Sequence, residues 1–186
     1  MFSRIEIRDL VISVIVLALV FSHYNVSLLP SYIFIVMIAF FSHEMSHKFV
    51  ALHYGCDAEY RMWKWGLVAG LILAIIPGGF VIAAPGAVYV SPYKKDFAFR
   101  VASLTRRNDA LISLAGPMAN IALAASLMAL NVFFPVDLLT VTAKISFFLA
   151  AFNLIPFPPF DGLKIMSWNN KVWLAMMAAS VAGIFI

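Results

Sequence analysis

Apolar residues run along this chain in long, nearly uninterrupted stretches, not in the alternating or one-sided patterns of soluble strands and helices. Most of these stretches approach or exceed the roughly 20 residues that an α-helix needs to cross a lipid bilayer. They occupy residues 10–29, 31–54, 66–90, 109–134, 138–155 and 172–186. The pattern predicts an all-α integral membrane protein with about five to six transmembrane helices, forming a single domain over residues 1–186.

The stretch at residues 66–90 differs from the others because turn-forming residues interrupt it. Pro-Gly-Gly at 77–79 and Pro-Gly at 85–86 would break a continuous helix twice. Between and after these breaks, residues 80–90 are rich in Val, Ile, Phe and Tyr, which favour strands. We therefore expect a short re-entrant or β-hairpin-like insertion near residues 66–90, with two complete crossings as the alternative.

Basic residues indicate how the chain is oriented in the membrane. If the N-terminus is cytoplasmic and the insertion returns to its starting side, almost every Lys and Arg lies inside. The links near residue 30 and at residues 132–136 carry none. A single crossing at residues 66–90 would instead place the basic loop at 94–107 outside. Charge therefore favours five spans plus a re-entrant insertion in the cell membrane.

Composition excludes several other classes of protein. The chain is 63% hydrophobic and only 12% charged, far from the balance of a soluble domain. Cys56 is the only cysteine, so neither an internal disulfide nor a thiolate metal site is available. The net charge of +4 fits membrane orientation, and we expect no nucleic-acid partner. Oligomeric state is not indicated.

One apolar stretch contains the sequence HEMSH at residues 43–47. On a helix, His43 and His47 lie on one face, where both imidazoles can reach one zinc ion. Glu44 is then placed to take a proton from a zinc-activated water molecule. The alternative is a polar helix end, with Glu44 and Lys48 forming an i to i+4 ion pair. Against it, His43 lies about 16 Å from a helix end at Tyr54, inside the apolar layer, where ionisable groups are costly and are functional candidates.

A catalytic zinc generally takes three protein ligands and leaves a position open. Asp161, in the segment NLIPFPPFDG, is the best-placed acidic residue, because three prolines end the preceding helix and leave an extended segment near the inner side of the membrane. Residues 109–134 and 138–155 form an out-and-back pair, so the re-entrant topology brings Asp161 to the side of His43. The alternative role of Asp161 is to cap the helix that follows it.

Two asparagines could contribute near this site. Asn153 could cap exposed helix carbonyls, or it could donate a hydrogen bond to a carbonyl oxygen during hydrolysis, and the two readings are about equal. Gly116 and Pro117, in the segment SLAGPMAN, indicate close helix packing. Asn120 in the same segment reaches the depth of the histidines and could contact the site.

With HExxH, AGPxxN and NxxPxPxxDG in this order, the sequence resembles the site-2 protease family of intramembrane zinc metalloproteases. The match covers about residues 40–165, and residues 58–65 look most like the archaeal branch. The resemblance implies one zinc ion per chain, bound by His43, His47 and Asp161. It also implies Glu44 as catalytic base and Asn153 as a residue that polarises the substrate carbonyl.

The resemblance further implies an endopeptidase that cuts within or near a transmembrane segment of another membrane protein, close to the cytoplasmic side. The substrate would have to unwind, and residues 80–90 could pair with it as an added strand. We expect none of the PDZ or CBS domains that many relatives carry. A membrane metal-ion transporter is one rival, although its polar residues should occupy both sides of the midplane. A catalytically inactive binder of transmembrane helices is the other.

Overall fold

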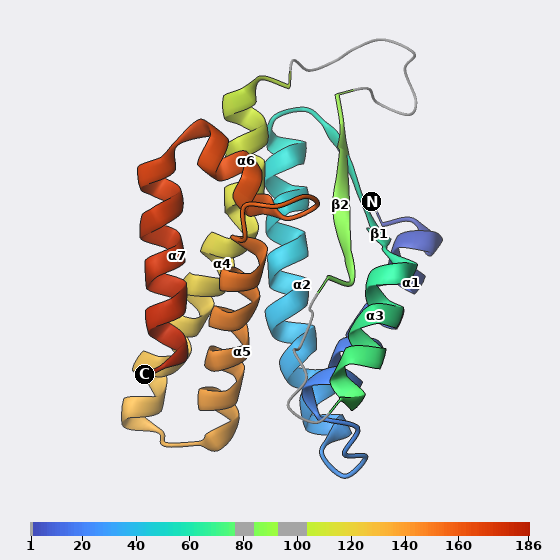
Figure 1. Cartoon of the computed structure of the whole chain (residues 1–186), viewed down its shortest axis with the longest axis vertical. Helices are drawn as coiled ribbons and strands as arrows, with labels where there is room; N and C mark the ends of the chain where they lie inside the picture. Colours follow the sequence, from blue (N-terminus) through green and yellow to red (C-terminus); the bar gives the residue numbers. More distant parts are fainter. Residues whose placement is uncertain (1, 77–83, 93–103) are drawn as a thin grey trace.

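The computed structural model of the chain describes residues 2–76, 84–92 and 104–186. These residues form seven helices and one two-stranded sheet (Figure 1). In chain order the elements are α1 (Arg4–Phe21), α2 (Leu29–His53), β1 (Asp57–Met62), α3 (Lys64–Ile75), β2 (Gly86–Ser91), α4 (Arg106–Phe133), α5 (Asp137–Asn153), α6 (Asp161–Trp168) and α7 (Asn170–Ile184). The predicted helical character is confirmed.

Helix α2 lies at the centre of the molecule. It packs against α4 and α5 on one side and against α1 and β1 on the other (Figure 1). Helix α4 also packs along α5, and α7 covers α5 from the far side. The short helix α6 lies against α4 and α7. Residues on α2 therefore contact both the helical bundle and the sheet.

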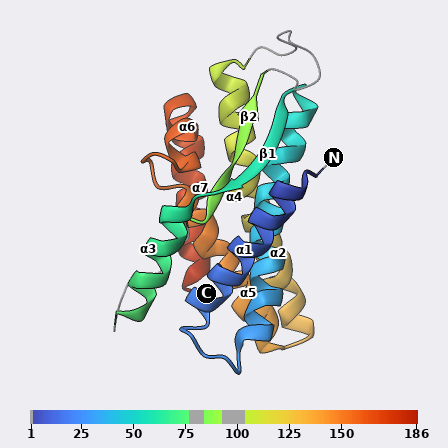
Figure 2. The same cartoon turned by 90° about the vertical axis from the view of Figure 1, so that its right-hand side faces the viewer.

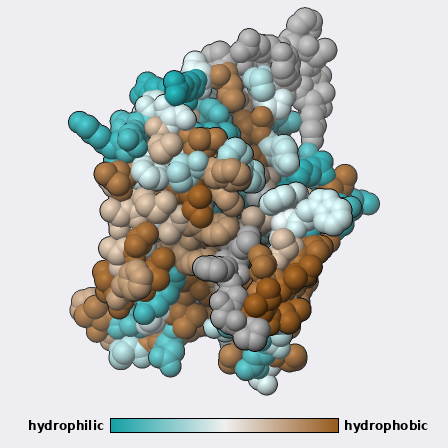
Figure 3. Space-filling view, viewed as in Figure 1, coloured by the Kyte–Doolittle hydropathy of each residue, from teal (hydrophilic) through white to brown (hydrophobic). Residues whose placement is uncertain are grey.

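Two helices, α2 and α4, are long and apolar enough to cross a membrane by length and composition. They contain 25 and 28 residues, which extends them over about 38 and 42 Å at the α-helical rise. Figure 3 shows hydrophobic side chains over much of the middle of one face, with hydrophilic side chains gathered towards the upper end and again at the lower edge. The other described helices do not meet the same criteria, so the count of five to six spans stays a prediction.

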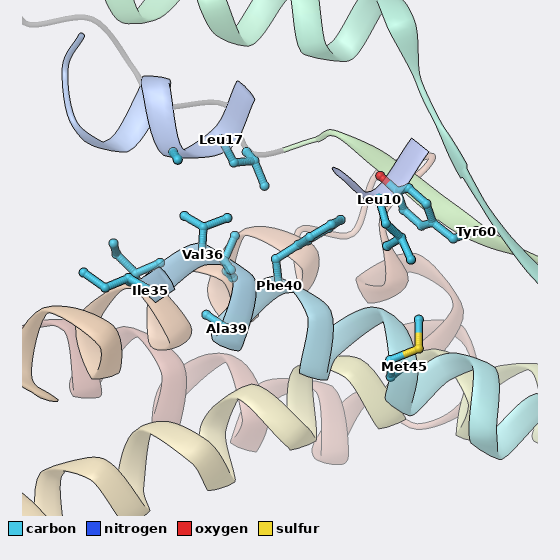
Figure 4. Close-up of a cluster of buried hydrophobic side chains, with 11 residues drawn as sticks. Leu10, Leu17, Ile35, Val36, Ala39, Phe40, Met45 and Tyr60 are labelled. Atoms are coloured by element: carbon cyan, nitrogen blue, oxygen red, sulfur yellow. The ribbon is translucent and has the colours of Figure 1, made fainter. Parts of the chain in front are cut away.

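The contact between α1 and α2 is built from buried apolar side chains. Phe40 of α2 meets the ring of Tyr60 of β1 edge-on, with 5.6 Å between the ring centroids. Around this pair lie the labelled residues of Figure 4, which are Leu10, Leu17, Ile35, Val36, Ala39 and Met45. This cluster holds α1 and the first strand against the central helix.

The two strands pair antiparallel, from Asp57 opposite Ser91 to Met62 opposite Gly86. The chain leaves the sheet through α3 and returns to it at β2 (Figure 2), and whether this segment is re-entrant in a membrane stays a prediction. The strand expected at residues 80–90 is observed from Gly86, while residues 77–83 lie outside the described part. The partner of β2 is β1, which lies before the predicted insertion. The apolar residues from Lys64 to Ile75 form helix α3 and do not supply a second strand.

Candidate active site

The HExxH residues occupy two successive turns of α2, deep in the molecule. His43 and His47 are 2% and 6% exposed, and their Nε2 atoms lie 3.0 Å apart. The i to i+4 spacing directs both rings to the same side of the helix. The two imidazoles thus present one nitrogen each to a common point.

Asp161 reaches this point from the other end of the chain. It is the first residue of α6, and its Oδ2 lies 3.5 Å from His43 Nε2 and 3.1 Å from His47 Nε2. Phe160, and not Asp161, is the N-cap of α6, and the carboxylate of Asp161 faces the two histidines. A Cβ on Gly162 would overlap the backbone carbonyl of Leu154. Glycine at this position therefore lets α6 begin against the end of α5.

The spacing of these three atoms suits a tetrahedral metal ion. Zinc takes nitrogen and oxygen ligands at about 2.0–2.1 Å, which separates the ligand atoms of a tetrahedral site by about 3.3 Å. The separations of 3.0, 3.1 and 3.5 Å bracket this value. His43, His47 and Asp161 could therefore hold a metal ion, and the donor set is consistent with zinc.

Hydrogen bonds to the far nitrogen of each ring orient the imidazoles. His47 Nδ1 lies 2.7 Å from the backbone carbonyl oxygen of Ile112 on α4. A carbonyl oxygen only accepts, so Nδ1 carries the proton and leaves the Nε2 lone pair directed at the metal position. This carbonyl could not be identified from the sequence, because a backbone oxygen has no residue signature.

Asn120 makes the corresponding contact with the ring of His43. Its side-chain amide is fully buried, and Nδ2 lies 3.2 Å from His43 Nδ1. No hydrogen bond from the described residues reaches Asn120 Oδ1. When His43 Nε2 binds a metal, Nδ1 carries a proton, and a half-turn of the amide brings Oδ1 into position to accept it. The structure thus brings Asn120 beside the site.

Gly116 makes the close approach of α4 to α2 possible. A Cβ at this position would overlap His47 Nε2 and would also press on the ring of His43. The sequence indicated only close helix packing for Gly116. The signal for this further role was a glycine in the middle of a long apolar helix, directly before Pro117.

Glu44 is 5% exposed and lines the same cavity as the two histidines. Among the described residues, no hydrogen bond reaches its Oε2 atom. The alternative ion pair between Glu44 and Lys48 is wrong, because Lys48 Nζ is bound by the carboxylate of Glu6 at 2.6 Å. The carboxylate of Glu44 is therefore left available for chemistry.

The cavity has a volume of about 410 Å³ and lies between α2, α4, β2 and the segment before α6. Strand β2 contributes Gly86 to Val90 to its wall. Asn153 also lines it, and its Nδ2 donates to the Leu149 carbonyl oxygen at 2.9 Å, which is the capping role. The second N–H of this amide is not used by that bond, so Asn153 can cap the helix and also donate a hydrogen bond into the cavity.

The histidines also influence the charge of Asp161. Burial alone would raise the pKa of this carboxyl, but the adjacent His47 and His43 hold the pKa well below its usual range. The side chain is therefore ionised at neutral pH, which is the form that binds metals.

Comparisons with known proteins relate the chain to a family of peptidases. The family model described as peptidase family M50 matches residues 31–136. A protein of Methanocaldococcus jannaschii named "Putative zinc metalloprotease MJ0611" is 41% identical over 179 residues, covering 92% of this chain and 88% of the relative. "Putative zinc metalloprotease YwhC" of Bacillus subtilis is 28% identical over 167 residues, covering 78% of this chain and 72% of the relative. No solved structure gives a significant match.

Proposed function

The chain belongs to peptidase family M50, and from this we propose that it is a zinc-dependent endopeptidase that hydrolyses peptide bonds within or near transmembrane segments of membrane-protein substrates. The observation that carries the proposal is the convergence of His43, His47 and Asp161 from α2 and α6. When bound there, zinc supplies the Lewis acidity that makes water a nucleophile at neutral pH.

Glu44 is the general base in this proposal. It takes a proton from the attacking water and delivers it to the leaving amide nitrogen as the carbon–nitrogen bond breaks. Its burial beside the two histidines supports this role, as does its Oε2, which accepts no hydrogen bond from the described residues. Asn153 lines the same cavity. Its free N–H would donate to the substrate carbonyl oxygen as negative charge develops there.

Strand β2 offers an extended substrate a place to pair. Antiparallel strands alternate between residues that bond across the pair and residues that point away from it. Trp63 donates to the Pro85 carbonyl oxygen across the pair, whereas the N–H of Tyr60 donates to Glu6 on the opposite edge. Val88, the partner of Tyr60, therefore directs its N–H and C=O to the outer edge of β2, beside the cavity. We propose that an unwound substrate segment pairs along this edge.

The proposed setting is the cell membrane, with five spans, a re-entrant segment and the active site towards the cytoplasmic side. Membrane embedding is a property of the M50 family. The length and apolar composition of α2 and α4 support it for this chain. The distribution of basic residues supports the cytoplasmic orientation.

A reconstituted cleavage assay tests the proposal. The purified protein is mixed in liposomes with a tagged-helix panel, which we define as single transmembrane helices of varied sequence that carry one tag at each end. We expect zinc-dependent appearance of two tagged products, loss of cleavage after chelation, and recovery with added zinc. Zinc flux across the liposome membrane without any cleavage of the panel would instead support a transporter.

A further inference from the structure

A buried carboxylate of α1 joins the catalytic helix to the sheet. Glu6 is 0% exposed, and both of its oxygens accept from Lys48 Nζ at 2.6 Å. Its Oε1 also accepts the backbone N–H of Tyr60 at 3.1 Å. One oxygen atom therefore holds a side chain of α2 and the backbone of β1 at the same time.

The two partners of Glu6 lie next to the two halves of the site. Lys48 directly follows His47 on α2. Tyr60 is paired with Val88, whose strand lines the cavity. The link through Glu6 is thus a short physical path from the metal-binding helix to the strand edge that faces the substrate.

Other polar residues of α1 hold the same strand. Asp9 Oδ2 accepts the backbone N–H of Met62 at 3.3 Å, and Ser13 Oγ lies 2.8 Å from the Tyr60 hydroxyl. Glu6, Asp9 and Ser13 follow one another at helical spacing along one side of α1. Helix α1 therefore occupies the outer edge of β1, so that β2 carries the remaining edge of the sheet.

An ion pair in this position is a poor choice for stability alone. Lys48 is 4% exposed, so both charges have lost their water, and apolar residues of similar volume often stabilise a protein at least as well. The ion pair adds geometric specificity, because its hydrogen bonds form only when α1, α2 and β1 lie at the right distances from one another.

We propose that Glu6 is a positioning residue, which fixes the strand pair relative to the metal-binding helix and thereby determines which peptide bond of a strand-paired substrate is cut. This inference rests on the proposed function. A substrate held by β2 is presented to the site at a register set by the position of the strand. If the strand can shift along α2, neighbouring peptide bonds reach the site in turn.

The test is a double variant that removes the link without leaving a buried charge. In Glu6→Gln with Lys48→Met, the glutamine oxygen still accepts the Tyr60 N–H, but the bond to α2 is lost. The matched control is Asp137→Asn with Lys144→Met, which makes the same kinds of change at two exposed positions of α5. Both variants are assayed against a cleaved member of the tagged-helix panel, with the products identified by mass spectrometry and the zinc content measured.

We expect the double variant to keep its zinc, to raise KM more than it lowers kcat, and to cut at two or more neighbouring bonds where the parent cuts at one. The control should match the parent in all three measurements. Glu6→Asp, which keeps the charge but is one methylene shorter, should also broaden the products.

Two results would overturn the inference. One is a double variant that cuts the parent bond alone with kcat/KM within twofold of the parent. The other is a loss of cleavage in proportion to the loss of folded, zinc-bound protein, with all products from the parent bond, because Glu6 would then be structural only. Both leave the proposed function intact, whereas failure of the parent to cleave any member of the panel would contradict the proposed function itself.

Discussion

Asp161 Oδ2 lies 3.1 Å from His47 Nε2, although the two residues belong to helices α6 and α2 at opposite ends of the chain. The contact closes a group of three side chains that could hold a metal ion, and His43 is its other member. It also ties the short helix α6 to the centre of the molecule. A metal ion bound at this group would therefore also fix the position of α6.

Replacing Asp161 with alanine should remove the metal. Two imidazoles alone leave a zinc site one ligand short of the usual three. We expect the zinc content of the purified protein to fall from about one ion per chain towards zero, and cleavage to fall by at least about 100-fold. Metal analysis after dialysis measures the first effect. Asp109→Asn is the control, because that carboxylate pairs with Lys164 and lies outside the ligand group; zinc retained by Asp161→Ala would remove Asp161 from the ligands.

Gly116→Ala should damage the site while leaving α4 intact. Alanine favours a helix over glycine by about 1 kcal/mol, so helix propensity alone predicts a more stable helix. The added Cβ would nevertheless overlap His47 Nε2. We expect zinc affinity, measured by competition with a chelator, to fall on the order of 10- to 100-fold. Ala122→Val, at an exposed position of the same helix, should leave the affinity unchanged, and equal losses in both variants would contradict a specific role of Gly116.

Asn120 should matter through its side-chain oxygen. Asn120→Leu keeps the approximate size but provides no acceptor for His43 Nδ1, so zinc affinity should fall by roughly 10- to 100-fold. Asn120→Asp keeps an acceptor and should retain more of the affinity than the leucine variant. Isothermal titration with zinc compares the two. Equal affinities for both variants and the parent would show that Asn120 does not orient His43.

Val88→Pro tests pairing of the substrate with β2. Proline removes the N–H that points away from β1, and it is tolerated in edge strands at such positions. We expect KM for a tagged helix to rise about fivefold, as the loss of one hydrogen bond of about 1 kcal/mol implies, with zinc content unchanged. Val88→Ala loses the side-chain packing but keeps the N–H. A KM of the alanine variant that equals that of the proline variant would assign the effect to packing instead.

The sequence was sufficient to predict that His43, His47 and Asp161 lie together, because the two histidines and the aspartate lie in local motifs. The i to i+4 spacing predicted that both histidine rings lie on one face of their helix. The topology of the apolar stretches predicted that Asp161 returns to the side of the membrane on which the histidines lie. The link between Glu6 and Lys48 was not predicted, since it joins residues 42 positions apart and the pair Glu44 and Lys48 offered a local alternative. The strand β1 was missed for a similar reason: the six-residue segment DAEYRM mixes charged and apolar residues, and its pairing with β2 decides its conformation.

The most direct test of a zinc site served by Glu44 is a comparison of Glu44→Gln with the parent, in which zinc content and cleavage of the same tagged helix are measured on the same preparations. Glutamine keeps the size of the side chain but cannot take up the proton. We predict that the variant binds zinc as the parent does, because Glu44 is not one of the three ligands, and that it produces no detectable cleavage. Cleavage at the rate of the parent, or loss of zinc together with activity, would contradict the account.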